Sequence, residues 1–350
     1  MGRFVAGECP ELDRLVAESL VAIGREVSEM RIPLLFGVVL GGGYGRGEGG
    51  ARGELKVESS KFKVESSKSD VACRLSNDLD FFAITKEGAT DADAAAVAKA
   101  LEPVSRRWTE KLGIDVDFTV KTPWRIRHDQ ERLMIQELVH GYCDVFGAKG
   151  EEMFAGVVRR EPGELPWMEA ARLLMNRGMG LLLAAEKLQS VADGRHPADD
   201  SRLSNVHSFI NRNINKCILG AGDAFLISRG LYRWRATERA DACEAQGFGG
   251  LYRAAVEWKF RPGNGPVCDW ETARQEWLDG KTEVIAAVDD SGYQRSIRSA
   301  ARWLLRRRTL GEFATFGMDP VVRVLERVAH LVEARSPVPP DVMRDWEIFN

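Results

Sequence analysis

A glycine-rich window that directly follows an apolar run is the feature that most constrains the fold of this chain. Seven of the ten residues in 41–50 are glycine, in a chain with 34 glycines among 350 residues. Residues 34–40 are apolar and lie between Pro33 and these glycines, so we predict a buried strand that ends in a tight turn. Glycines let the backbone approach a ligand and present N–H groups, which is one way that proteins bind phosphate. The window therefore predicts a phosphate-facing turn.

Two common phosphate-binding motifs do not account for this turn. A Walker A loop ends in Gly-Lys followed by Ser or Thr, and that ending is missing here. The spacing Gly45-x-Gly47-x-x-Gly50 matches a dinucleotide fingerprint, but no helical pattern follows it. The acidic residue expected about 20 positions further on would also fall in a polar repeat. We therefore predict neither a P-loop nor a dinucleotide-binding fold.

Two Asp-x-Asp pairs lie at or near the starts of predicted strands. The first pair is Asp78 and Asp80, and the second is Asp115 and Asp117. Residues i and i+2 of a strand point to the same face, so each pair can present two carboxylates together. Mg²⁺ takes oxygen ligands and shares its coordination with substrate phosphates, and two such ions can flank one phosphoryl transfer. The residues thus predict a magnesium site at Asp78 and Asp80, completed by Asp115 or Asp117.

The first half of the chain alternates helices and strands. We predict helices over 10–29 and 91–111, and strands over 34–40, 79–84, 114–120 and 142–146. Pro103 is expected to bend or end the first segment of the second helix. Residues 54–70 hold two copies of the unit Lys-Val-Glu-Ser-Ser-Lys, which predicts a polar surface loop or a small exposed hairpin. We place an inserted polar loop at about 51–73.

The second half of the chain is helical in pattern from Pro166 onward. We predict helices over 168–185, 206–230, 250–260, 270–288, 293–308 and 320–334. Glycine and proline cluster in 147–166, which is typical of a domain boundary. The prediction is therefore an α+β catalytic domain over 1–150 and an all-α domain over 151–350.

One predicted helix of the second half carries a polar face. Helical spacing puts Arg212, Asn215, Lys216 and Asp223 on one side of it. A cation on this face could reach a bound triphosphate, and Lys216 is the strongest candidate. The alternative is an ordinary solvated helix face.

Charge and cysteine content exclude several classes of protein. The net charge is −3, from 49 basic and 52 acidic residues, so no global basic surface for nucleic acid is indicated. We interpret Arg306–Arg308 as the basic end of a helix. The six cysteines are scattered, which predicts free thiols in a reducing, cytoplasmic setting. No apolar stretch approaches the roughly 20 residues that span a membrane.

The order of these motifs resembles the DNA polymerase beta-like nucleotidyltransferase superfamily. A strand is followed by Gly42-Gly43-x-x-Arg46-Gly47, then by Asn77-Asp78-x-Asp80, and then by a third strand that carries aspartates. This order is most similar to the minimal and antibiotic nucleotidyltransferases, whose signature is Gly-Ser-x-x-Arg-Gly followed by Ser-Asp-x-Asp. The resemblance covers residues 30–122. It departs from the signature at Gly43, where serine is usual, and in the longer spacing between the two motifs, which a loop insertion explains at little thermodynamic cost.

The resemblance implies a role for each matched position. Gly42, Gly43 and Arg46 are expected to hold a nucleoside triphosphate. Asp78 and Asp80 are expected to bind Mg²⁺. The family fold is a mixed sheet with flanking helices, and relatives often add a helical domain that shapes the acceptor site.

The third strand is expected to supply the last carboxylate of the site. Asp117 is the preferred residue and Asp115 stays open, and this carboxylate would bind metal and help to deprotonate the acceptor. The implied reaction is the Mg²⁺-dependent transfer of a nucleoside monophosphate, AMP from ATP, to a small molecule or protein with release of pyrophosphate. The alternative is an inactive nucleotide-binding or protein-interaction module on the same fold.

Overall fold

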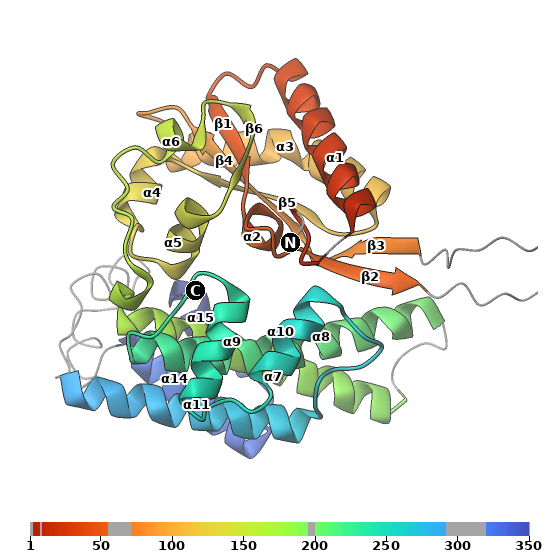
Figure 1. Ribbon diagram of the computed structural model, residues 1–350. Coiled ribbons are helices and arrows are strands. Elements are labelled where there is room, and N and C mark those ends of the chain that lie inside the picture. The colour runs from red at the N-terminus through yellow and green to blue at the C-terminus, as the bar shows by residue number, and fades with distance from the viewer. Residues whose placement is uncertain (1–2, 8, 55–71, 195–199, 292–319, 350) are drawn as a thin grey trace, which may run out of the picture. The chain divides into compact units, whose positions relative to one another are not determined.

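The protein has a mixed α+β fold that clusters into two compact units. The computed structural model describes residues 3–7, 9–54, 72–194, 200–291 and 320–349. The first unit is Met1–Arg160 with Lys259–Gly263, and the second is Glu161–Trp258 with Asn264–Asn350. Figure 1 labels the elements of both units.

The first unit is built on a four-stranded mixed sheet with the order β5-β4-β1-β6. Strand β4 is parallel to β5, whereas β1 is antiparallel to both β4 and β6. A separate antiparallel pair joins β2 and β3. The strands of this unit are β1 (Leu35–Leu40), β2 (Gly50–Glu54), β3 (Ala72–Ser76), β4 (Leu79–Thr85), β5 (Val116–Lys121) and β6 (Cys143–Gly147). Its helices are α1 (Pro10–Glu29), α2 (Gly42–Gly45), α3 (Asp91–Leu112), α4 (Pro123–His128), α5 (Leu133–His140) and α6 (Gly150–Met153).

Helices cover both faces of the four-stranded sheet. Residues of β1 alternate between the two cores: Val38 and Leu40 pack with α1 and α3, whereas Val39 packs with α4 and α5. Phe81 and Phe82 of β4 divide between the cores in the same way. Successive residues of a strand point to opposite faces, so a sheet that is buried on both faces needs apolar residues on both sides of its strands.

The predicted helix 10–29 and the predicted strands of the first half are confirmed, with small shifts at their ends. The predicted helix 91–111 is confirmed as α3, and of the two expectations for Pro103, a bend or an end of the helix, the end is wrong because α3 continues through this proline to Leu112. Leu101, Val104 and Trp108 around this proline are buried, and their packing offsets the lost backbone hydrogen bond. The glycine turn itself contains the short helix α2, which the sequence pattern did not predict.

The ends of the predicted inserted loop are strands rather than loop. Strands β2 and β3 pair from Gly50 with Ser76 to Glu54 with Ala72. Residues 55–71, which contain the polar repeat, lie outside the described residues. The predicted helix 293–308 and Arg306–Arg308 also lie outside them.

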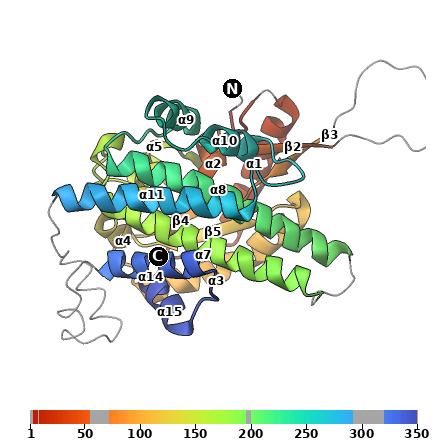
Figure 2. The same cartoon turned by 90° about the horizontal axis from the view of Figure 1, so that it is seen from below.

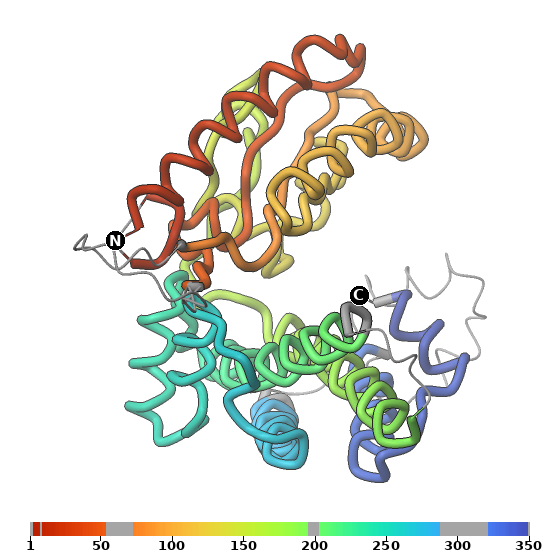
Figure 3. Tube along the Cα trace, turned by 90° about the vertical axis from the view of Figure 1, so that its right-hand side faces the viewer, coloured from red at the N-terminus to blue at the C-terminus, as the bar shows by residue number. Residues whose placement is uncertain are grey.

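The second unit is helical, and α7 contacts α8, α11, α14 and α15. Figure 2 shows α7, α8 and α11 side by side, and Figure 3 shows α14 and α15 in blue beside α7. Trp277 of α11 is fully buried, and its indole N–H donates to the Leu174 carbonyl of α7 at 2.9 Å. The helices of this half are α7 (Trp167–Ala192), α8 (Asp200–Ser228), α9 (Ala236–Ala245), α10 (Tyr252–Phe260), α11 (Trp270–Ser291), α14 (Pro320–Ala334) and α15 (Pro340–Phe349).

Five of the six helices predicted for the second half are confirmed, and α9 and α15 were not predicted. Helix α9 buries mainly small residues such as Ala236, Ala240 and Cys243, which give a weak apolar pattern. All six cysteines are free. No helix in the described ranges is long and apolar enough to cross a membrane.

Candidate functional site

The glycine turn lies directly against the first aspartate pair. The Gly41 N–H donates to the Asp80 main-chain carbonyl at 2.8 Å. Gly42 has a left-handed backbone, with φ of +59°. A Cβ atom on Gly42 would overlap the Asp80 carboxylate oxygen and lie 3.1 Å from Asp80 Cγ. Glycine is therefore required at residue 42 both by the backbone and by the neighbouring carboxylate.

The parallel pairing of β4 and β5 brings the second aspartate pair beside the first. Asp80 is opposite Asp117 in the strand register. The Leu79 N–H donates to the Asp115 carbonyl at 2.9 Å, which extends the pairing to the residue before β5. Partners in register on neighbouring strands project to the same face, so Asp80 and Asp117 share a face of the sheet.

Negative charge accumulates at this end of the two strands. The pKa of Asp117 is raised by partial desolvation and by the negative charges of Asp115 and Asp78. Like charges held close together disfavour ionisation unless a cation relieves them.

The donor set suits Mg²⁺ that arrives with a phosphate ligand. No group of three or more His, Cys, Asp or Glu side chains in the described part of the chain is arranged as a metal site on its own. Mg²⁺ in phosphoryl-transfer sites is bound by one or two carboxylates together with substrate phosphates and water. Asp80 provides a carboxylate next to the glycine turn, and Asp117 is opposite it on the neighbouring strand.

Gly43 closes the turn through its main chain. Its carbonyl accepts hydrogen bonds from Glu48 N–H at 2.7 Å and from Arg46 N–H at 3.2 Å. A Cβ atom on Gly43 would lie 3.2 Å from the Glu48 carbonyl oxygen, which is a tight contact. The close return of the chain at Glu48 is thus a local reason for glycine at residue 43.

Arg46 is engaged in ion pairs inside the first unit. Its Nε lies 3.6 Å from Glu48 Oε2, and its Nη1 lies 3.5 Å from Glu137 Oε2. Only 12% of the Arg46 side chain is exposed. The sequence predicted a triphosphate ligand at this position, and the structure gives the guanidinium two carboxylate neighbours that fix the end of the turn.

Tyr44 ties the turn to the β2–β3 pair and was not predicted to have a role. The side chain is buried, and its hydroxyl is 2.8 Å from the Gly50 carbonyl and 2.6 Å from the Ser76 carbonyl. Burial raises the pKa of this phenol well above its usual range, so it stays neutral. A tyrosine among glycines is the sequence signal that would have suggested a tether, because a large aromatic side chain needs a core to enter.

Asn77 sets the backbone just before Asp78. Its φ is +71°, in the left-handed region that asparagine tolerates better than most residues. Its side-chain amide donates to the Lys259 main-chain carbonyl at 3.1 Å. The Asn-Asp-x-Asp motif therefore begins with a residue whose type suits an unusual backbone conformation.

Lys216 lies on α8 in the second unit, whereas the four aspartates lie in the first. Two other residues of the predicted polar face, Asn215 and Asp223, make side-chain contacts within the second unit. Asn215 is buried and bonds to Asn211 and Val267 through its side chain.

Asp223, the second of these polar-face residues, forms an ion pair with Arg239 at 2.9 Å and accepts a hydrogen bond from the Tyr252 hydroxyl. The predicted ligand-facing surface is thus partly a structural one.

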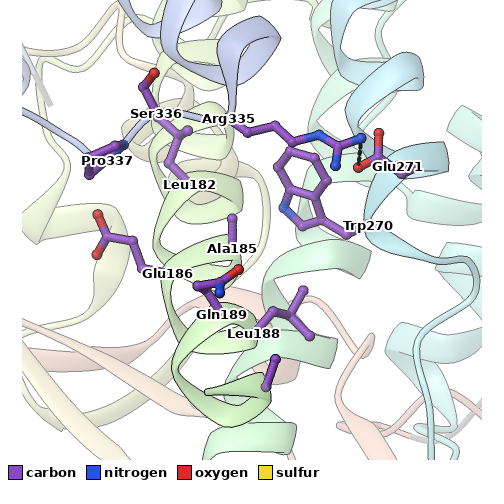
Figure 4. A pocket seen from close by; sticks show the side chains of 11 residues that line it. Leu182, Ala185, Glu186, Leu188, Gln189, Trp270, Glu271, Arg335, Ser336 and Pro337 are labelled. Atoms are coloured by element: carbon purple, nitrogen blue, oxygen red, sulfur yellow. Dashed lines mark ion pairs between the residues drawn. The ribbon is translucent and has the colours of Figure 1, made fainter. Parts of the chain in front are cut away.

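A separate pocket of about 810 Å³ lies within the second unit (Figure 4). Leu182 and Ala185 of α7 line it together with Trp270. Figure 4 shows Arg335 extended over Trp270 and paired with Glu271. None of the residues predicted for the nucleotide site is among those that line this pocket in the described part of the chain.

Comparisons of the chain with protein-family models, with curated proteins and with solved structures found no match.

Proposed function

We propose that this protein is a Mg²⁺-dependent nucleotidyltransferase that moves a nucleoside monophosphate, AMP from ATP, to a small-molecule or protein acceptor and releases pyrophosphate. The observation that carries the proposal is the contact between the glycine turn and Asp80, with Asp117 in register on the neighbouring strand. This juxtaposition puts a backbone surface without side chains next to carboxylates, which is what a site for a metal-bound triphosphate needs.

Each residue has a task in this proposal. Gly42 and Gly43 give the triphosphate access to the backbone of the turn. Asp78, Asp80 and Asp117 would hold Mg²⁺, which supplies charge neutralisation at the phosphates and lowers the pKa of the acceptor. We assign Asp117 the further task of taking the acceptor proton, with Asp115 as the alternative. The catalytic gain then comes from positioning and electrostatics rather than from a covalent step.

The test incubates the protein with labelled ATP, Mg²⁺ and a panel of metabolites and proteins as candidate acceptors. Turnover is measured as the release of pyrophosphate. Asp80→Asn is expected to lower turnover by at least about 100-fold, because a metal ion supplies several kcal/mol of charge stabilisation. Asp91→Asn is the matched control, since this aspartate is exposed and paired with Arg125 on the surface. Turnover that survives both Asp78→Ala and Asp80→Ala would refute the metal site.

The same site supports a second candidate, a module that binds nucleotide without turnover. The observations that favour it are the ion pairs that occupy Arg46 and the lack of a three-carboxylate metal site in the described ranges. Saturable binding of Mg²⁺–ATP without pyrophosphate release for any acceptor in the screen would favour this candidate over the enzyme.

A further inference from the structure

A short segment from the second half of the sequence belongs to the first unit. The chain leaves this unit after Arg160 and returns to it for Lys259–Gly263 only. Strand β2 holds the returning segment through Arg52, whose guanidinium donates to the Pro262 carbonyl at 3.4 Å and the Gly263 carbonyl at 3.2 Å. The segment begins with Lys259, which contacts Glu48 at the end of the glycine turn and Asn77 at the start of the aspartate motif.

The first of these contacts is made by the Lys259 ammonium. Its Nζ lies 3.3 Å from Glu48 Oε2, and only 2% of the Glu48 side chain is exposed. A buried carboxylate is stable only when cations or hydrogen bonds compensate its charge. The same oxygen is 3.6 Å from Arg46 Nε, so the Lys259 ammonium lies nearer to it than the Arg46 guanidinium does. Glu48 in turn closes the glycine turn, because its N–H donates to the Gly43 carbonyl.

The second contact is made by the Lys259 main chain. Its carbonyl accepts the side-chain N–H of Asn77 at 3.1 Å, and Asn77 is the left-handed residue that precedes Asp78. The carbonyl also lies against Gly50, where a Cβ atom would come within 2.7 Å of it. The backbone at residue 259 is therefore packed closely between the start of β2 and the start of the aspartate motif.

We infer that Lys259 is a positioning residue of the candidate nucleotide site, acting on the glycine turn through Glu48 and on Asp78 through Asn77. The inference rests on the proposed function for the identity of the ligand, but the two contacts themselves do not depend on it. Residues 1–160 alone lack this part of the site. A lysine distant in sequence thus holds together two motifs that are themselves far apart along the chain.

The test uses the full chain with Lys259→Met, Lys259→Arg and Asn77→Gly. Asn77→Gly tolerates the left-handed backbone and removes the side chain that carries the amide donor. Lys281→Met is the matched control, because Lys281 has a similar exposure, 19% against 22%, and pairs with Glu326 at 2.9 Å in the second unit. Amide hydrogen exchange is measured over 42–49 and 76–80 without any ligand.

Lys259→Met is expected to speed exchange over 42–49 by about tenfold or more, and Asn77→Gly to do the same over 76–80. Lys259→Arg should restore the wild-type exchange of 42–49, because it keeps the charge beside Glu48, and Lys281→Met should leave both segments unchanged. Unchanged exchange in Lys259→Met, or equal acceleration in the control, would overturn the inference.

Binding of Mg²⁺–ATP separates this inference from the proposed function. Lys259→Met should raise the Kd by about tenfold, and Lys259→Arg should return it to within a few fold of wild type. If the wild-type chain binds no nucleotide while the exchange results hold, the proposed function fails and the positioning role stands. If the wild type binds and turns over ATP while Lys259→Met changes neither exchange nor Kd, the proposed function stands and the positioning role fails.

Discussion

Gly42 and Asp80 are packed so closely that residue 42 has no room for a side chain. The glycine has a left-handed backbone, and a Cβ atom there would overlap the Asp80 carboxylate. Gly42 begins α2, two residues after β1 ends at Leu40, and Asp80 lies near the start of β4, the strand that pairs antiparallel with β1. This contact joins the glycine turn to the aspartate motif and makes Gly42 a sensitive position for substitution.

Gly42→Ala is expected to abolish turnover by displacing the Asp80 carboxylate. Gly88→Ala is the matched control, because Gly88 also has a positive φ, +83°, but has open space around its Cα. Both variants should lose about 1–2 kcal/mol of stability from backbone strain alone. ATP turnover and urea unfolding are measured for both variants. Any further loss in Gly42→Ala then comes from the contact of the new Cβ atom with the Asp80 carboxylate. Equal turnover in both variants would contradict a functional role for the Gly42–Asp80 contact.

Tyr44→Phe tests the tether between the turn and the β2–β3 pair. The change removes the hydroxyl that lies near the Gly50 and Ser76 carbonyls and leaves the ring in place. We expect a loss of about 1–3 kcal/mol in the free energy of unfolding, because buried carbonyls lose their partner. Urea denaturation measures the change, and a variant as stable as wild type would show that the hydroxyl adds nothing to the tether.

Pro103→Ala is expected to stabilise the protein. Pro103 lies inside α3 and is exposed, so alanine restores a backbone N–H without opening a cavity. The gain should be about 1–2 kcal/mol, less than the roughly 3 kcal/mol helix penalty of proline because proline also restricts the unfolded chain. Glu102→Ala, at the neighbouring exposed position, should change the free energy of unfolding much less. A destabilised Pro103→Ala variant would mean that the ring itself packs usefully.

Local signals explain how much of this fold was predictable. The strand over 34–40 has proline on one side and glycines on the other, and the helix over 10–29 has a regular apolar face, so both were found from sequence. The same local rules predicted that Pro103 bends or ends its helix, and the expected end is wrong because burial of Leu101 and Trp108 outweighs one missing hydrogen bond.

Contacts between distant segments account for what the sequence did not show. The aspartate pairs were visible as motifs, but the opposition of Asp80 and Asp117 depends on the parallel register of two strands. The contacts of Lys259 join residues more than 180 positions apart, and nothing in the local sequence marks them. Likewise, helical spacing put Asn215 and Lys216 on one polar face but did not reveal that the Val267 N–H would bond to Asn215.

Lys121→Met gives a prediction about pH. Burial lowers the pKa of Lys121, so the folded state disfavours the charged form that the unfolded chain carries below its ordinary pKa of 10.5. The unfolded state then binds more protons than the folded state between the lowered pKa and the ordinary one, and wild-type stability rises with pH across that window. Methionine removes this penalty, so the variant should gain stability over wild type at pH 7, and the gain should shrink as the pH approaches 10.5. Urea unfolding of both proteins at pH 7 and near pH 10.5 measures the difference in the free energy of unfolding. A difference that is independent of pH would show that the buried charge of Lys121 does not destabilise the folded state.

Removal of the metal should affect stability as well as activity. On the proposed function Asp78, Asp80 and Asp117 hold the ion, so Mg²⁺ with a nucleotide is expected to raise the melting temperature of the wild-type chain, and a chelator should reverse the shift. Asp117→Asn leaves one carboxylate fewer to hold the ion and should give a smaller shift, whereas Asp91→Asn, on the surface of α3, should match wild type. The comparison needs no acceptor, so it tests the proposed metal ligands separately from turnover. A full shift in Asp117→Asn would remove this residue from the metal site and leave Asp115 as the third carboxylate to test.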